Sequence, residues 1–137
     1  MISVDTGFLY ALIDRRDRWH ARAAAMAGTA AEGWITTWPV LTEACHLLTA
    51  RVGPRHARDL MADVADGGLR VWDIPSAQWA RVPALIDQYA TLPMDLADAS
   101  LVLLAEHLGH GRILSTDERD FGAYRWKQRE PFHNLLA

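Results

Sequence analysis

The segment Met94–Gly109 constrains the fold of this chain more than any other, because it predicts one long amphipathic helix. Its apolar residues recur at helical spacing and would form a buried stripe: Leu101, Leu104, Ala105 and Leu108. Pro93 precedes the helix and Gly109 closes it, and these residues are typical start and stop signals. The segment therefore predicts a core helix with defined ends.

Two aspartates stand at the start of this helix. Asp95 and Asp98 are three residues apart, so they lie on one face near the first turn. Asp95 fits a cap, or a first-turn acid that complements the helix dipole. Asp98 is followed by an almost wholly apolar run, and a carboxylate that enters a core is costly unless it is paired or binds a cation. Asp98 therefore directs attention to acids elsewhere that can converge on it.

The length of 137 residues predicts a single domain, residues 1–137. Half of the residues are hydrophobic, which is enough for a proper core. The formal net charge of −3 argues against binding nucleic acid by bulk charge alone. The single cysteine, Cys45, excludes an internal disulfide, and no apolar run reaches membrane-spanning length. We therefore expect a cytoplasmic protein with no membrane segment.

Short apolar runs alternate with helical patterns along the chain. The expected strands are Met1–Val4, Trp34–Thr37, Leu69–Ile74, Arg112–Ser115 and an edge strand at Pro131–Leu136. The other expected helices are 8–14, 17–26, 39–48, 55–66 and 77–90, with a loop at 28–33 and a polar turn at 118–121. Pro83 either kinks the helix at 77–90 or marks its true start. This alternation predicts an α/β fold with about five mainly parallel strands and helices on both faces.

Four acids from distant segments are expected to meet in this fold. Asp5 and Asp117 follow predicted strands, and Glu43 and Asp98 stand in the first turns of predicted helices. Ligands of parallel sheets bind beyond the carboxyl ends of the strands, so all four acids belong to one rim. Each acid alone also has a structural explanation as a cap, a turn residue or a helix-dipole partner. Their joint placement carries the prediction of a site.

Clustered carboxylates repel one another unless a cation neutralises them. Oxygen ligands without His or Cys select Mg²⁺ or Mn²⁺ over zinc. Such ions activate water and stabilise the charge that develops at phosphorus, so the cluster is typical of a nuclease. The hydroxyls of Thr6 and Thr116 flank the predicted site, where they would hold water or a phosphate oxygen, or only form turn hydrogen bonds.

The sequence resembles the PIN-domain ribonucleases, especially the VapC-type toxins of bacterial toxin–antitoxin modules. The matching stretches are Val4-Asp-Thr-Gly-Phe-Leu, Thr42-Glu-Ala, Asp98-Ala-Ser-Leu-Val-Leu-Leu-Ala-Glu and Ile113-Leu-Ser-Thr-Asp-Glu-Arg-Asp-Phe. The acidic quartet of the family falls on Asp5, Glu43, Asp98 and Asp117. Asp120 matches a further acid of many members and Thr116 the hydroxyl residue near the metal, whereas Asp95 lies outside the shared core. The resemblance implies a PIN-like fold.

The resemblance further implies an endoribonuclease that uses one or two Mg²⁺ or Mn²⁺ ions. Asp5, Asp98 and Asp117 would bind metal, and Glu43 would orient or deprotonate the attacking water or join the metal shell. Members of this group cut structured RNA such as tRNA or ribosomal RNA and thereby stop translation. The expected products carry a 5′-phosphate and a 3′-hydroxyl.

RNA must approach this acidic rim, so basic residues near it in the sequence are candidate phosphate contacts: Arg15, Arg16, Arg119 and Arg125. The resemblance also implies a cognate antitoxin, and a homodimer or a toxin–antitoxin hetero-oligomer. Trp19, Trp38 and the apolar face around Leu47 and Leu48 are the expected partner-facing patch.

Three other classes of protein are weighed against the nuclease. A haloacid-dehalogenase-like phosphatase needs a second Asp two residues after the first, and that position is Gly7. A phosphoryl-accepting receiver domain needs an Asp after the third strand, where Asp73 is a loose candidate, and a lysine near the later strands, where only Lys127 is present. A non-catalytic PIN-like protein that only binds a partner remains the alternative, although the intact quartet argues against it.

Overall fold

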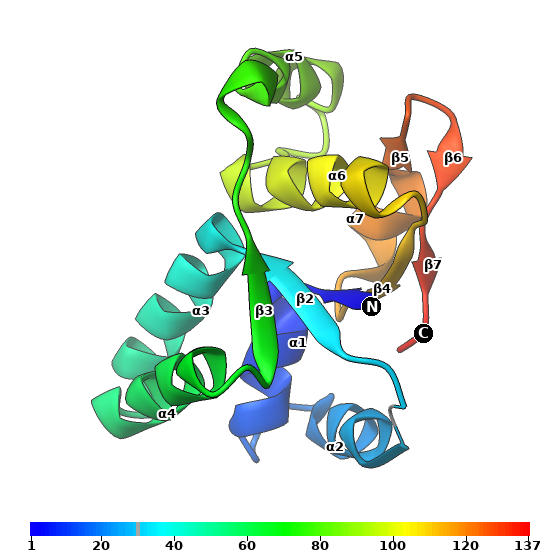
Figure 1. Cartoon of the computed structure of the whole chain (residues 1–137). Helices are drawn as coiled ribbons and strands as arrows, with labels where there is room; N and C mark the ends of the chain where they lie inside the picture. Colours follow the sequence, from blue (N-terminus) through cyan, green and yellow to red (C-terminus); the bar gives the residue numbers. More distant parts are fainter. Residues whose placement is uncertain (30) are drawn as a thin grey trace.

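A five-stranded parallel sheet forms the centre of the molecule in the computed structural model, which describes residues 1–29 and 31–137 (Figure 1). Its strands lie in the order β3-β2-β1-β4-β7 and every pairing is parallel. Their bounds are β1 Ile2–Val4, β2 Trp34–Thr37, β3 Leu69–Trp72, β4 Arg112–Leu114 and β7 His133–Asn134. The predicted α/β fold with a mainly parallel sheet is confirmed, including the edge strand near the C-terminus.

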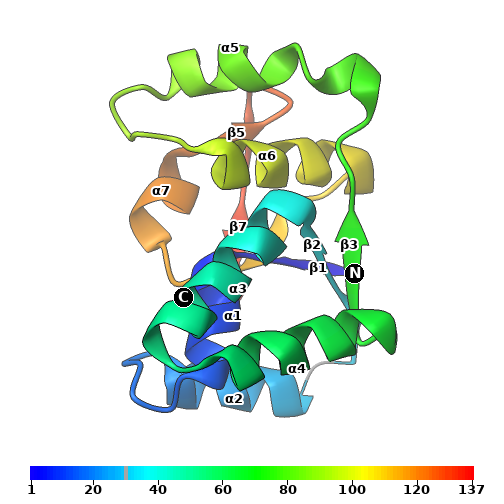
Figure 2. The same cartoon turned by 90° about the vertical axis from the view of Figure 1, so that its left-hand side faces the viewer.

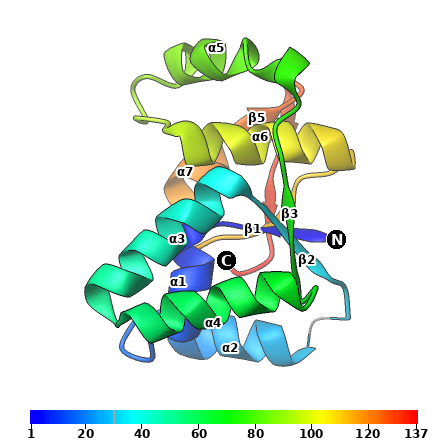
Figure 3. The same cartoon turned by 60° about the vertical axis from the view of Figure 1, so that its left-hand side comes forward.

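Helices connect these strands and lie in two groups. Their bounds are α1 Thr6–Ile13, α2 His20–Thr29, α3 Trp38–Arg51, α4 Pro54–Ala65, η1 Ser76–Gln78, α5 Arg81–Gln88, α6 Leu96–Leu108 and α7 Glu118–Ala123. Helices α1, α2 and α4 lie together on one side, and α5 and α6 lie on the other (Figure 2). Helix α3 contacts both α1 and α6 (Figure 3). A small antiparallel pair, β5 Arg125–Trp126 and β6 Glu130–Pro131, packs near α6 and was not expected from the sequence.

Helix α6 is more deeply buried than its amphipathic pattern predicts. Every residue from Ala99 to Ala105 is buried, because the helix packs on β1 and β2 and is also covered by α3, α5 and β5. Leu108, expected in the buried stripe, is only partly buried. The predicted ends are confirmed, because Asp95 is the N-cap and Gly109 closes the helix at φ 78°.

Two local expectations are wrong for identifiable reasons. The segment expected as one helix at 77–90 is a short 3₁₀ turn followed by α5. Pro83 is the third residue of α5, where its missing N–H costs no helical hydrogen bond, so it marks the true start. The polar turn expected at 118–121 is helix α7, because the Asp117 side chain accepts a hydrogen bond from Asp120 N at 3.0 Å and caps it.

On α4, Met61 is 52% exposed, whereas Leu60 beside it is buried. The loop expected at 28–33 includes residue 30, which lies outside the described residues. Among the described residues, none of the helices is long and apolar enough to cross a membrane.

Candidate active site

The predicted site residues line one pocket at the carboxyl edge of the sheet, with a volume of about 410 Å³. This acidic pocket receives all four quartet residues and all four supporting residues: Asp5, Glu43, Asp98, Asp117, Thr6, Thr116, Asp120 and Asp95. They come from β1, α1, α3, α6 and α7 or the turns beside them. The topology therefore brings together what the sequence spreads over more than a hundred positions.

The acids are held by the same hydrogen bonds that start the helices. Asp5 follows β1 and caps α1, because its Oδ1 accepts from Phe8 N at 2.8 Å. Asp95 and Asp98 form a reciprocal capping box at the start of α6. Glu43 lies in the second turn of α3 and not in the first, because the helix begins at Trp38 under the cap of Thr37. Asp117 likewise caps α7. Hydrogen bonds at helix starts therefore hold three of the four quartet carboxylates in place.

Ser115 is a site residue that sequence reasoning missed. Its Oγ donates to Asp5 Oδ2 and accepts from Asp117 N at 2.9 Å, so one hydroxyl joins two acids. The parallel register pairs Val4 with Leu114, which sets the next residues, Asp5 and Ser115, side by side. Asn134 on the edge strand exchanges hydrogen bonds with the Ser115 backbone at 3.1 and 2.9 Å and holds it there. In the sequence, the one indication of this role was that Ser115 is a small polar residue directly before Thr116 at a strand end.

Tyr124 is a second missed residue. Its ring is fully buried between Tyr89 and Phe121, and its hydroxyl donates to Asp98 Oδ2 at 3.2 Å. Burial, followed by the charge of Asp98, raises the pKa of Tyr124. The phenol therefore stays protonated and orients the Asp98 carboxylate.

Electrostatics distinguish two of the acids. The pKa of Asp5 is raised from 3.8 to about 6, mainly by burial; its hydrogen bonds with Ser115 and Phe8 lower the pKa, and the charges of Asp117 and Glu43 raise it. The pKa of Asp98 is raised to about 7, mainly by burial and next by the charge of Asp95. The protein itself supplies too little positive charge here to stabilise the ionised forms.

The two threonines contribute differently. Thr6 Oγ1 is buried and has no hydrogen-bond partner among the described residues. Thr116 crowds Gly7, where a Cβ would overlap its Oγ1, so glycine is required for the close approach of the two turns. An unpartnered buried hydroxyl beside four acids indicates a place for a ligand.

The donor set fits a hard divalent cation, because it consists of carboxylate and hydroxyl oxygens without His or Cys. Within the described part of the chain, no group of three or more His, Cys, Asp or Glu side chains is already arranged around one point to hold a metal ion. The reason is visible in the hydrogen bonds, since Asp5, Asp98 and Asp117 each use an oxygen to cap a helix. Binding of an ion therefore requires the side chains to close in.

The four arginines that were predicted to contact phosphate lie in different parts of the structure. Arg119 lines the acidic pocket and is 77% exposed. Arg15 and Arg16 lie past the far end of α1, about 12 Å from its capping residue Asp5 at 1.5 Å per residue. The guanidinium of Arg125 donates to the Gly122 and Tyr124 carbonyls at 3.0 and 2.9 Å. Sequence proximity to the site was misleading, because a helix carries Arg15 and Arg16 away from it.

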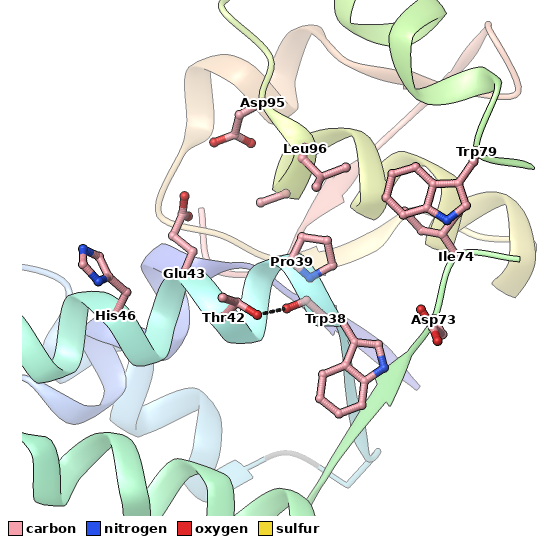
Figure 4. Close-up of a pocket in the computed structure, with 11 residues that line it drawn as sticks. Trp38, Pro39, Thr42, Glu43, His46, Asp73, Ile74, Trp79, Asp95 and Leu96 are labelled. Atoms are coloured by element: carbon pink, nitrogen blue, oxygen red, sulfur yellow. Dashed lines mark hydrogen bonds between the residues drawn. The ribbon is translucent and has the colours of Figure 1, made fainter. Parts of the chain in front are cut away.

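An apolar groove of about 640 Å³ opens beside the acidic pocket, between the starts of α3 and α6 (Figure 4). Trp38, Trp79 and Leu96 line it and are 48%, 45% and 38% exposed. Glu43 and Asp95 line both the groove and the acidic pocket, so the two are continuous. Of the expected partner-facing patch, Trp38 lies on the groove, whereas Leu48 is fully buried and does not belong to the surface.

The protein is thus an α/β protein with a parallel sheet. Its four quartet carboxylates gather in one pocket at the carboxyl edge of that sheet. The chain belongs to the PIN-domain family, whose model matches residues 2–127. It is 25% identical over 122 residues to Ribonuclease VapC26 of Mycobacterium tuberculosis, covering 89% of this chain and 90% of that protein. The predicted resemblance to VapC-type PIN proteins is confirmed.

The fold has a solved counterpart. The crystal structure of VapC20 of Mycobacterium tuberculosis, described as a Sarcin-Ricin loop cleaving toxin, superposes with a TM-score of 0.80. The two chains are 22% identical, and the match covers 87% of this chain and 92% of the other. The expected PIN-like fold is confirmed by this likeness.

Proposed function

We propose that this protein is the toxin of a toxin–antitoxin module, a metal-dependent endoribonuclease that cuts structured cellular RNA such as tRNA or ribosomal RNA. One observation carries the proposal: four acids from separate segments line one pocket, and none of these four carboxylates forms an ion pair within the part of the chain that the structure describes. Membership of the PIN family and the likeness to a protein named a ribonuclease support the same activity.

Asp5, Asp98 and Asp117 would hold one or two Mg²⁺ or Mn²⁺ ions, with Thr6, Thr116 and Asp120 beside them. Such an ion supplies Lewis acidity toward a phosphoryl oxygen and toward water. Ser115 keeps Asp5 and Asp117 adjacent, and Tyr124 keeps the Asp98 carboxylate turned toward the pocket. Glu43 does not cap a helix, because Thr37 caps α3. Its carboxylate could therefore accept a proton from attacking water or complete the metal shell.

The apolar groove supports the proposal of an antitoxin partner. Its exposed tryptophans and Leu96 offer an apolar surface, and Glu43, Asp73 and Asp95 place acids along it. This combination suits a segment with apolar side chains and a cation. Such a segment would also reach the acidic pocket, because Glu43 and Asp95, labelled in Figure 4, line both the groove and that pocket. A homodimer or hetero-oligomer, a single domain over 1–137 and a cytoplasmic location stay predictions.

The test is cleavage of total RNA by the purified chain with Mg²⁺ or Mn²⁺, with and without chelator. Asp98→Asn should lower the rate at least a hundredfold, because it removes a charge that positions the ion. Glu106→Gln is the matched control, since it neutralises another acid of α6 that lies outside the acidic pocket.

Cleavage that requires both the metal and Asp98, and that leaves 5′-phosphates, would support the proposal. The positions of the cut ends would reveal the target RNA. Cleavage that survives Asp98→Asn would contradict it. Absence of cleavage by protein freed of any partner would favour the non-catalytic, partner-binding alternative.

A further inference from the structure

Arginines gather at a corner of the molecule that lies at the opposite ends of α1 and α3 from the acidic pocket. Two segments meet there, the turn after α1 and the junction of α3 with α4 (Figure 2). The Arg16 guanidinium donates to the Arg51 carbonyl at 3.2 Å and ties the two segments together. We call this surface the basic corner and define it by Arg15, Arg16, Arg18, Arg51, Arg55 and Arg58, all of which are exposed.

The charge of this corner is opposite to that of the rest of the chain. Its two segments, 14–18 and 51–59, hold six of the fourteen Lys and Arg residues but only three of the seventeen Asp and Glu residues. The corner therefore has a formal excess of three positive charges, although the whole chain carries −3. A local field of this sign attracts polyanions.

Most of this charge is not neutralised by the protein. Asp14 pairs with Arg16 and Asp59 with Arg58, whereas Arg15, Arg18, Arg51 and Arg55 have no carboxylate partner among the described residues. Two of these are held by aromatic rings: Arg51 lies 5.6 Å from the centre of the Tyr10 ring and Arg18 lies 5.4 Å from that of Trp19. A ring positions a guanidinium without cancelling its charge, so these groups remain available to phosphates.

The corner has a fixed place relative to the acidic pocket. Helices α1 and α3 pack on each other, begin at the pocket and end at the corner. Along α3, Glu43 and Leu47 line the pocket and Arg51 follows one turn later, about 12 Å beyond Glu43. A nucleic acid held in the pocket would therefore meet the corner a short distance from the reacting phosphate.

We propose that the basic corner is a second RNA-binding surface that grips the phosphate backbone of the substrate away from the cut. This inference rests on the proposed ribonuclease activity and adds to it a preference for RNA large enough to span both surfaces. The acidic pocket repels the backbone, and the corner supplies the attraction that the pocket lacks.

The test compares two double variants that remove equal charge from exposed positions. Arg51→Gln/Arg55→Gln changes the corner, and Arg70→Gln/Arg129→Gln is the matched control elsewhere on the surface. Each is combined with Asp98→Asn, so that the RNA stays intact, and binding of a fluorescent RNA stem–loop is measured between about 50 and 200 mM salt. The corner variant should bind about tenfold more weakly, and its slope of log K against log salt should fall by about 1.5, while the control should change little.

A second measurement uses both double variants with Asp98 intact. In the corner variant, KM for cleavage of the stem–loop should rise with kcat unchanged, and cleavage of a very short oligonucleotide should not change. Equal losses in both double variants, or a loss that also affects the short oligonucleotide, would overturn the inference while leaving the ribonuclease activity established. If the parent protein neither binds nor cuts any RNA, the proposed function fails, and this inference fails with it.

Discussion

The acids at the two ends of α6 differ in the charge of their hydrogen-bond partners. Near its C-terminal end, Glu106 is 16% exposed and receives both terminal nitrogens of the Arg81 guanidinium, one of them at 2.9 Å. At its start, Asp98 lies beside Asp95, and within residues 1–29 and 31–137 its carboxylate accepts hydrogen bonds from neutral donors alone, the Asp95 N–H and the Tyr124 hydroxyl. The first acid has its counter-charge within the fold, whereas the second has none among the described residues and, under the proposed function, would receive it from a metal ion. A carboxylate that serves structure is compensated locally, and one that awaits a ligand is not.

The strongest way to test this contrast is to add the missing charge. Mg²⁺ at a hundred times its dissociation constant should stabilise the wild type by about 2.7 kcal/mol, because it binds the folded pocket and not the unfolded chain. Thermal unfolding with and without Mg²⁺ measures this gain, which Asp98→Asn should largely lose and Glu106→Gln should keep. A gain of equal size in all three proteins would show that the ion binds elsewhere.

Ser115 offers a smaller perturbation of the same site, because it is a neutral group that holds two of the acids. Ser115→Ala should lower metal-dependent cleavage about tenfold, as is typical when a group that orients metal ligands is lost. The Ser115 hydrogen bond lowers the pKa of Asp5, so its removal should also move the pH profile of cleavage to higher pH.

Ser100→Ala is the control for Ser115→Ala, since Ser100 is equally buried but bonds Thr37 and the Ala97 carbonyl. It should leave the pH profile in place. A shift of the profile in both variants would mean that Ser115 has no special role as a positioning residue.

The smallest expected effect is on stability without metal, and it differs in sign between the two ends of the helix. Glu106→Gln should destabilise the protein by about 1 kcal/mol, because it breaks a partly buried charged hydrogen-bond pair with Arg81. Asp98→Asn should stabilise it by roughly 1 kcal/mol at pH 8, where the wild-type carboxylate is ionised at a cost.

The sign of the Asp98 effect follows from its raised pKa. The folded protein keeps the proton up to about pH 7, whereas an unfolded Asp loses it near 3.8, so stability falls as the pH rises between these values. Urea unfolding in chelator should therefore show a smaller advantage of Asp98→Asn at pH 5 than at pH 8. If Asp98→Asn were stabilised equally at both pH values, the gain would come from packing and not from the charge of Asp98.

The sequence by itself determined the elements and the acids. Alternating apolar runs and caps such as Asp95 and Gly109 act over a few residues, so their consequences can be predicted locally. The acids could be assigned to one rim because parallel topology sends every strand end to the same edge.

Only the tertiary structure decided which groups surround those acids. Ser115 stands beside Asp5 through the register of two strands, and Tyr124 reaches Asp98 because β5, which directly follows Tyr124, packs against α6. Arg16 and Arg51 meet because α1 and α3 carry them to the same corner, away from the acidic pocket at which both helices begin. Helix periodicity fixes the direction of a side chain from its own axis, but the identity of its neighbour depends on how elements distant in sequence pack together.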